Sequence, residues 1–191
     1  MKPHHEIEIK LEVRHPRLLK KRLAALGFRA VKARHLERNY MFDFPDRRLR
    51  KARRLLRLRF AGPQPLLTYK GSPLHSQQYK IRSEIETHVE DGHRLRRILE
   101  CLGLKETFRF EKYRTVYAQP TTAGDGSHRL VVYDETPVGD YLELEGSERW
   151  IDEVAQKLGY QREDYITASY AALFFRKCSK LARVPGNMVF D

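Results

Sequence analysis

The first strand expected from the sequence is marked by a strict alternation of apolar and charged residues near the N-terminus. Residues 6–13 are Glu-Ile-Glu-Ile-Lys-Leu-Glu-Val. A period of two places four apolar side chains on one face of a β-strand and three carboxylates and an ammonium on the other. Taken alone, such a strand is typical of a sheet with one solvated face.

Similar patterns predict the other elements of the chain. Further strands are expected over 32–43, 53–60, 66–70, 80–86, 107–117, 129–134 and 141–146. Helical spacing of apolar residues predicts helices over 17–26, 93–102, 150–158 and 165–177, the last with Asp164 as its N-cap. A tight turn is expected at Gly124-Asp125-Gly126, and 182–191 is expected to be a loose tail.

The order of these elements restarts near residue 80. Glu84-Ile85-Glu86 repeats the Glu-Ile-Glu of the opening strand, and a helix again ends in Leu-Gly before three more strands. Matching features lie about 75–78 residues apart, which is typical of an internal duplication. We therefore expect eight strands in two similar halves. No linker divides them, so a single domain is expected over 1–180, followed by a tail over 181–191.

Composition narrows the class of protein and the kind of partner. The 191 residues hold 37 lysines and arginines against 25 acids, a formal net charge of +12. That length supports one sizeable core, or at most two small ones. The positive field favours an anionic partner. No window approaches the roughly 18 apolar residues of a membrane span, so we expect a cytoplasmic protein in which Cys101 and Cys178 are buried thiols.

Charges on the polar faces of the strands are sorted by sign along the chain. Acids dominate the first and last strands, and arginines and lysines dominate the strands between. The amphipathic helices need an apolar surface to cover, which the strands supply on their other face. The charged faces would then line a closed interior. Since unpaired buried ions cost several kcal/mol each, such an interior is expected to hold a charged ligand.

The residue types indicate the chemistry of that ligand. Carboxylates two positions apart on a strand point the same way and can share a hard cation. Oxygen ligands without histidine or cysteine suit Mg²⁺ or Mn²⁺. Rows of arginine and lysine suit phosphate oxygens. The sequence therefore predicts a polyphosphate site with a divalent metal.

At these residues the chain resembles the CYTH superfamily, the triphosphate tunnel metalloenzymes. Glu6-x-Glu8-x-Lys10 looks like the ExExK signature of that family, which is weak alone but strong as part of an ordered set over about residues 4–177. The set continues with Arg57-x-Arg59, Lys70, Arg82-x-Glu84-x-Glu86, Lys112-x-Arg114, Asp134 and Glu143-x-Glu145. The resemblance implies an α+β fold, with an eight-stranded antiparallel β-barrel, a charged lumen and helices outside.

The resemblance also implies roles for individual residues. The implied metal ligands are Glu6, Glu8, Asp134, Glu143 and Glu145. The implied substrate contacts are Lys10, Arg57, Arg59, Lys70, Arg82, Lys112 and Arg114. Glu6, Glu8, Lys10 and Glu84 are expected to be catalytic, with Glu86 as a further candidate for a second metal or for orienting water. Lys177 and Lys180 are candidates for a substrate contact from the last helix.

Three activities are considered for such a tunnel. The first is metal-dependent hydrolysis of inorganic triphosphate, ATP or thiamine triphosphate. The alternative is class IV adenylyl cyclase chemistry, which makes cyclic AMP and pyrophosphate from ATP. The third is a non-catalytic polyphosphate or RNA binder, since the basic runs 47–51 and 53–54 would suit a phosphate backbone. No nucleic-acid reading motif is present, so nucleic acid is not the expected partner. The oligomeric state is left open, with a homodimer as one option.

Overall fold

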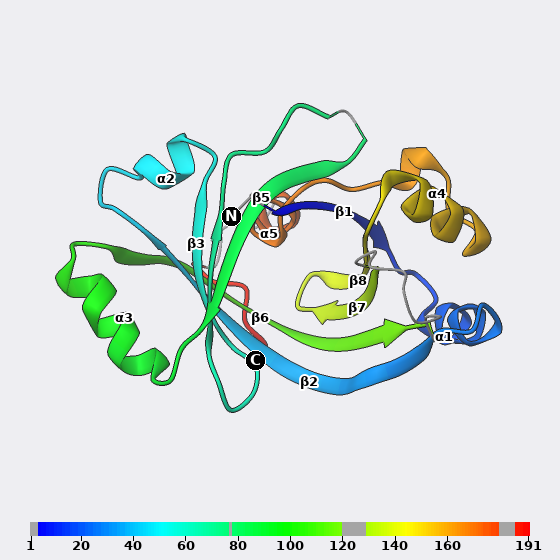
Figure 1. Ribbon diagram of the computed structural model, residues 1–191, viewed down its shortest axis with the longest axis horizontal. Helices are drawn as coiled ribbons and strands as arrows, with labels where there is room; N and C mark the ends of the chain where they lie inside the picture. The colour runs from blue at the N-terminus through cyan, green and yellow to red at the C-terminus, as the bar shows by residue number, and fades with distance from the viewer. Residues whose placement is uncertain (1–3, 77, 120–128, 180–185) are drawn as a thin grey trace.

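Antiparallel strands close into a barrel in the computed structural model, which describes residues 4–76, 78–119, 129–179 and 186–191 (Figure 1). The strands of this part are β1 (His4–Glu12), β2 (Arg29–Asp43), β3 (Leu55–Phe60), β4 (Leu66–Lys70), β5 (Lys80–His88), β6 (Lys105–Ala118), β7 (Leu130–Thr136) and β8 (Gly139–Glu145). Their order around the barrel is β1-β5-β4-β3-β2-β6-β7-β8, with β8 closing on β1. The predicted eight-stranded antiparallel barrel is confirmed.

The strand pairing supports the predicted duplication. If β1, β2, β3 and β4 are exchanged for β5, β6, β7 and β8 respectively, every pair of neighbouring strands in the barrel remains a pair. For example, β1 pairs with β5 and β8, and its counterpart β5 pairs with β1 and β4. The long central pair, β2 with β6, maps onto itself. Each half also inserts one helix between its first and second strands. The barrel therefore consists of two interlocked units of the same design.

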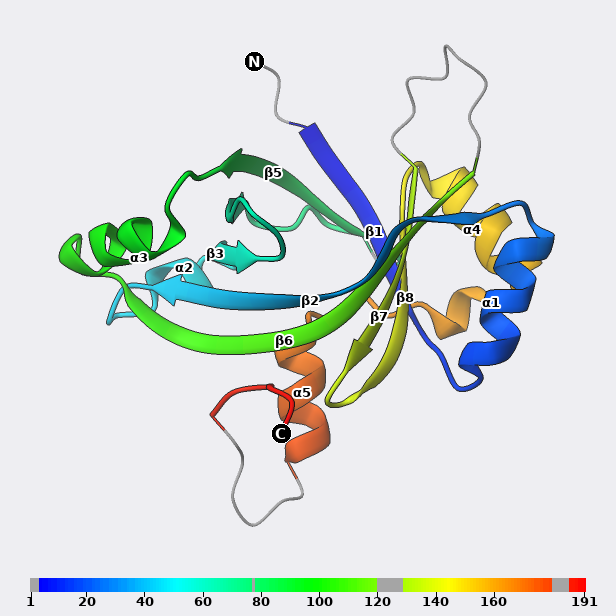
Figure 2. The same ribbon diagram turned by 90° about the horizontal axis from the view of Figure 1, so that it is seen from below.

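Helices pack around the barrel, most of them against the apolar outer faces of the strands (Figure 2). They are α1 (Pro16–Ala25), α2 (Arg48–Lys51), α3 (Gly92–Cys101), α4 (Glu148–Lys157), α5 (Tyr170–Cys178) and the 3₁₀ helix η1 (Arg162–Asp164). The largest core joins α1 and α4 to the outer faces of β1, β7 and β8. Ile9, Leu23 and Ile151 are fully buried there, and each contributes roughly 1.5–3 kcal/mol through burial.

The two faces of β1 lie on opposite sides of the barrel wall. Ile9 and Leu11 are fully buried in the outer core. The opposite face carries Glu6, Glu8 and Lys10, whose exposed fractions are only 7%, 7% and 2%. Charged residues this deeply buried are costly unless they are paired or hold a ligand. The charged face of β1 is therefore a wall of the lumen and not a solvated surface.

The start of the last helix differs from the prediction. Asp164 belongs to η1, where its carboxylate accepts the backbone N–H of Gln161 at 2.8 Å. The chain then runs extended, and Ile166 exchanges two backbone hydrogen bonds of 2.9 Å with Lys10 of β1. The helix begins only after Ser169, whose hydroxyl accepts the N–H of Ala172. Asp164 was the wrong cap because a strand-like contact with β1 takes the intervening residues.

Two further expectations were wrong, and others lie outside the described residues. Cys101 is exposed at the end of α3, whereas Cys178 is buried as expected. In the described end of the chain, Met188 is fully buried and exchanges backbone hydrogen bonds with β6, so this part is not a loose tail. The predicted turn at Gly124–Gly126 and the candidate Lys180 fall outside the described residues.

Among the described helices, none is both long enough and apolar enough to cross a membrane.

Candidate functional site

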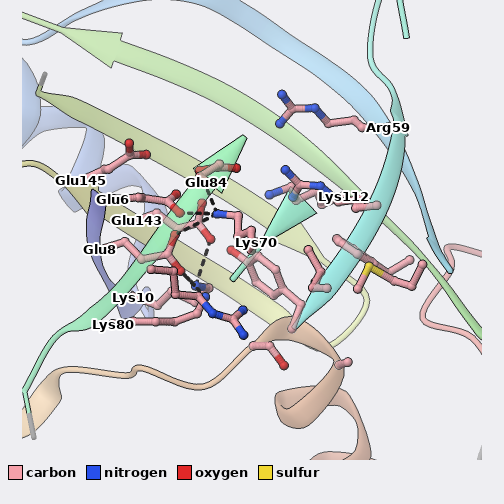
Figure 3. A pocket seen from close by; sticks show the side chains of 18 of the residues that line it. Glu6, Glu8, Lys10, Arg59, Lys70, Lys80, Glu84, Lys112, Glu143 and Glu145 are labelled. Carbon is pink, nitrogen blue, oxygen red and sulfur yellow. Dashed lines mark hydrogen bonds and ion pairs between the residues drawn. The ribbon is translucent and has the colours of Figure 1, made fainter. Parts of the chain in front are cut away.

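The lumen contains a cavity of about 270 Å³ whose wall is dominated by ionisable side chains (Figure 3). Six carboxylates line it: Glu6, Glu8, Glu84, Glu86, Glu143 and Glu145. Eight cations line it as well: Lys10, Arg57, Arg59, Lys70, Lys80, Arg82, Lys112 and Arg114. In Figure 3 the labelled glutamates gather on one side together with Lys10, Lys70 and Lys80, and Arg59 and Lys112 lie on the other. The cavity thus has an acidic and a basic end.

Strand register brings the acidic end together. Glu8 of β1 lies opposite Glu145 of β8 on one side and Lys80 of β5 on the other. Lys10 lies opposite Glu143, and Glu6 lies opposite Arg82. Directly opposite residues point to the same face of an antiparallel sheet. Three neighbouring strands, β8, β1 and β5, therefore present their charged rows side by side.

Lysines hold Glu8 in its ionised form. Its Oε1 accepts a hydrogen bond from Lys10 Nζ at 3.1 Å and another from Lys80 Nζ. Burial alone would raise the pKa of Glu8, but the ammonium groups of Lys10, Lys80 and Lys70 lower the pKa well below its ordinary range. Lys10 also lies 3.2 Å from Oε1 of Glu143. The positive charges around Glu8 therefore neutralise its carboxylate.

Glu6 has the opposite electrostatic character. Burial and then the negative charges of Glu8, Glu145 and Glu84 raise the pKa of Glu6 to about 9, and these effects outweigh the ammonium of Lys70. Lys70 donates to Glu6 Oε2 and lies 3.2 Å from Glu84 Oε2. One lysine is thus shared among several carboxylates. The positive charge of Lys70 is therefore too small to offset burial and the neighbouring carboxylates at Glu6.

Two buried carboxylates, Asp134 and Glu37, contact the cations of the basic end. Asp134 is fully buried and accepts hydrogen bonds from Lys112 Nζ at 2.8 Å and from Arg114 Nε at 2.7 Å. Glu37, with 2% exposure, lies 3.7 Å from Lys112 Nζ and 3.8 Å from Arg114 Nε. Tyr170 of α5 donates to Asp134 at 2.7 Å. These contacts fix the two cations at the cavity wall.

The remaining arginines lie on β3, next to β4 and β5. Arg57 Nη2 donates to Thr68 Oγ1 at 3.2 Å, and Thr68 Oγ1 donates to Glu86 Oε1 at 2.6 Å. Arg59 Nη1 lies 3.7 Å from Glu37 Oε1, an ion pair without close hydrogen-bond geometry. Burial lowers the pKa of Arg59, and the positive charge of Arg57 lowers it further. The two neighbouring guanidinium groups repel each other in a way that an anion between them would relieve.

The structure brings together nearly all the residues predicted for the site. All but one of the predicted catalytic, substrate and metal residues line the cavity. The exception is Asp134, which lies opposite Arg114 in the strand register but has its oxygens taken by Lys112, Arg114 and Tyr170. Its Oδ2 shares the Arg114 guanidinium with Glu143, another of the predicted metal ligands. Lys177 is not on the wall either, because its ammonium donates to the carbonyl of Val138.

Three residues that were not predicted for the site line it or contact its cations. Lys80 lines the cavity beside Glu8, and it follows the same alternation as Arg82 and Glu84, so a signal was present. Glu37 lies in β2, where the charges do not alternate cleanly. Tyr170 lies on a helix, outside any strand pattern. Asn39 is fully buried on β2, and its amide has no hydrogen-bond partner in the described part of the chain.

The donor set fits a divalent cation in charge and chemistry. Glu6, Glu8, Glu143 and Glu145 offer only carboxylate oxygens, which suit Mg²⁺ or Mn²⁺. Burial, followed by the charges of the neighbouring carboxylates Glu8, Glu145 and Glu84, raises the pKa of Glu6, and a cation at this cluster would offset the repulsion among these carboxylates. Within the described residues, no three acidic, histidine or cysteine side chains already form a metal cage. The ammonium groups of Lys10, Lys70 and Lys80 contact these carboxylates.

Comparison with known proteins agrees with this geometry. The sequence profile of the CYTH domain matches residues 4–170, and the chain therefore belongs to the CYTH family. Proteins of this family are generally dependent on divalent metals and act as triphosphatases or adenylyl cyclases. A Methanocaldococcus jannaschii protein named "Putative adenylate cyclase MJ0240" is 30% identical over 178 residues, which cover 88% of this chain and 97% of that protein.

Solved structures share the fold at lower identity. A Vibrio parahaemolyticus protein described as a "putative adenylate cyclase" matches with a TM-score of 0.76 and 17% identity, over 90% of this chain and 98% of that one. A Hippeastrum protein described as a "putative adenylyl cyclase" with a dominant triphosphatase activity matches with a TM-score of 0.62 and 19% identity, over 95% and 99%. Both support the same barrel architecture.

Proposed function

We propose that this chain hydrolyses a small triphosphate in a divalent-metal-dependent reaction inside the barrel. The observation that carries the proposal is the single cavity with an acidic and a basic end. A triphosphate carries several negative charges along a short chain, so it matches a row of fixed cations. The acidic end beside that row matches the metal ion that accompanies such substrates. The family membership and the triphosphatase activity described for the Hippeastrum neighbour are consistent with it.

The cations of the wall would bind and orient the phosphate chain. Arg57, Lys112 and Arg114 are held by hydrogen bonds to side chains of neighbouring strands, so their positions are set before substrate arrives. Donors fixed in advance stabilise the charge that grows on phosphate oxygens without a reorganisation cost. Lys10 and Lys70 lie between the two ends, because each contacts carboxylates of the acidic cluster while lining the same cavity.

Glu6, Glu8, Glu143 and Glu145 would hold the metal ion. When bound, the metal neutralises phosphate charge and makes water a better nucleophile. Glu84 lies beside this cluster, and we assign it the role of orienting the attacking water and accepting its proton. Water attacks the terminal phosphorus, the bond to the bridging oxygen breaks, and orthophosphate leaves the shortened phosphate chain.

An activity panel tests the proposal directly. The full chain is incubated with inorganic triphosphate, ATP or thiamine triphosphate, each with Mg²⁺, Mn²⁺ or a chelator, and the products are identified. We expect orthophosphate release from at least one substrate, and only with a divalent metal. Hydrolysis that continues at full rate in the chelator, or no turnover of any of the three substrates, would contradict the proposal.

Adenylyl cyclase activity is the second candidate, because the Methanocaldococcus relative carries that name. In that reaction the ribose 3′-hydroxyl attacks the α-phosphorus of ATP, and pyrophosphate leaves. The same cations and carboxylates would serve it. Incubation with ATP and Mn²⁺ separates the two reactions, since cyclic AMP as the main product would replace our first choice, whereas orthophosphate and ADP would support it.

A further inference from the structure

A group of six cations lies outside the cavity, between β2 and β3. It comprises Arg47, Arg48, Arg50, Lys51, Arg53 and Arg54, which we call the basic loop. All six are exposed. The short helix α2 lies within this segment, beyond the end of β2 (Figure 1). Six cations in eight residues produce a concentrated positive field on one surface of the barrel.

The backbone of the basic loop is held in one conformation. The buried carboxylate of Asp43 accepts three backbone N–H groups, those of Phe44, Leu49 and Arg50, at 2.7, 3.0 and 2.9 Å. The hydroxyl of Ser72 donates to the carbonyl of Ala52 at 2.6 Å. A loop that is ordered in advance loses less conformational entropy when it binds a ligand. The six cations are therefore displayed on a fixed support.

The basic loop concentrates six cations without a carboxylate partner among the described residues. Some other exposed arginines are paired, for example Arg34 with Glu135 at 2.8 Å, Arg97 with Glu100 at 3.3 Å and Arg149 with Glu153 at 2.9 Å. None of the six loop cations forms an ion pair with a described carboxylate. Repulsion among six unpaired cations favours a bound anion over an empty surface. The loop is thus suited to an extended anionic ligand.

Contacts join the basic loop to the cavity. Arg82 lines the cavity and donates a hydrogen bond to the carbonyl of Arg53. Leu55, which begins β3, also lines the cavity and follows Arg53 by two residues. The loop therefore adjoins the wall formed by β3 and β5. An anion chain that leaves the cavity on this side meets the basic loop next.

We propose that the basic loop binds the outer part of a linear inorganic polyphosphate whose end lies in the cavity. This inference rests on the proposed function for the position of that end. Binding of single-stranded nucleic acid usually adds aromatic side chains on which bases stack. The aromatic ring nearest the loop in sequence, Phe44, is covered by the Arg48 guanidinium, 3.3 Å from the ring centroid. A phosphate chain without bases needs only the cations.

A binding experiment with the full chain tests the loop independently of catalysis. Arg50→Gln, Lys51→Gln and Arg54→Gln are combined, because these side chains take part in no described side-chain contact. The matched control combines Arg14→Gln, Arg17→Gln and Lys21→Gln, which removes the same charge from exposed positions at and before α1. Affinity for linear polyphosphate is measured in a chelator over a range of salt concentrations. Single-stranded RNA with a 5′-hydroxyl group is the second probe.

We expect the loop variant to lose at least about tenfold in polyphosphate affinity, and its salt slope to fall by about 2, since each lost phosphate contact accounts for about 0.7. The control variant should change by less than about twofold. Equal losses in both variants would show a general field effect and overturn the inference, as would a loss of RNA binding with polyphosphate binding unchanged. Failure of triphosphate hydrolysis would refute the proposed function, yet this binding comparison would still decide the role of the loop.

Discussion

The hydroxyl of Tyr170, in the first turn of α5, donates a 2.7 Å hydrogen bond to the fully buried Asp134 of β7. The same Asp134 binds Lys112 and Arg114 of the cavity wall. The ring of Tyr170 also lies near both Lys10 and Lys112, with its centroid 5.3 and 4.9 Å from their Nζ atoms. The start of α5 is thus tied to the cations that would bind phosphate.

Tyr170→Phe removes one of the donors to Asp134 and keeps the ring. We expect a loss of about 1–2 kcal/mol in the free energy of unfolding, together with a rise in KM for triphosphate, because Arg114 and Lys112 are then less firmly positioned. Urea unfolding and steady-state kinetics measure the two effects. Tyr141→Phe is the matched control, since Tyr141 is buried nearby but its hydroxyl has no described hydrogen-bond partner. Equal effects of the two variants would contradict the assigned role.

Glu37 is expected to make stability depend on pH. Burial raises the pKa of Glu37, but Arg114, Lys112 and Arg59 lower it more, from its ordinary 4.5 to about 2. A group whose pKa is lower in the folded state stabilises the fold above its unfolded pKa, and this stabilisation is lost as the pH falls through the folded pKa. Ionised Glu37 should therefore contribute roughly 3 kcal/mol above pH 4.5, declining toward pH 2.

Glu37→Gln tests this dependence by urea unfolding at several pH values. The variant should be less stable than the natural chain near neutral pH, and the difference should shrink as the pH falls below about 4. Glu163→Gln, at an exposed position, should show no such convergence. A constant difference at every pH would assign the effect of Glu37 to packing and not to charge.

The role of the acidic end as a metal site can be tested with a control substitution in the same strand, β1. Glu6→Gln and Glu145→Gln each remove a proposed metal ligand, and we expect metal-dependent phosphate release to fall by at least about 100-fold. Glu12→Gln is the matched control, because Glu12 follows the same alternation in β1 but is exposed and lies off the cavity wall. Activity should persist in that variant. Full activity in both Glu6→Gln and Glu145→Gln would refute the site assignment.

The outer core should be sensitive at α1. Leu23 is fully buried between α1 and the barrel, so Leu23→Ala is expected to cost about 2–5 kcal/mol of unfolding free energy. Leu18 on the same helix is 44% exposed, and Leu18→Ala should cost less than about 1 kcal/mol. Chemical denaturation compares the two. Similar losses would mean that α1 does not pack on the barrel as described.

Much of the fold could be predicted because the two faces of the barrel wall impose opposite requirements. In β1, Ile9 must pack outside and Glu8 must face the lumen, so the sequence alternates clearly. Charged residues that alternate along a strand share one face, and nearly all of those predicted for the site line one cavity. The resemblance to the CYTH family supplied the closed tunnel, which periodicity alone does not distinguish from a solvated sheet.

The remaining features depend on contacts between distant segments. Asp134 alternates like a lumen residue, but Lys112, Arg114 and Tyr170 take its oxygens, so its carboxylate does not line the cavity. The delayed start of α5 follows from backbone pairing of Ile166 with Lys10, which no local pattern reveals. Glu37 was missed because β2 is long and irregularly paired with β6, so its charges do not follow one period. Such long-range effects appear only when the chain is folded.

The interlocked pairing of the two halves has a consequence for the order of folding. β1 pairs with β5 and β8 but with none of the three strands that follow it in its own half. A nascent chain that ends before β5 has therefore made the first strand without either neighbour, and the barrel cannot close until β8 has been synthesised. Such non-local pairing slows folding. During synthesis, both backbone edges of β1 stay available to any other strand in reach.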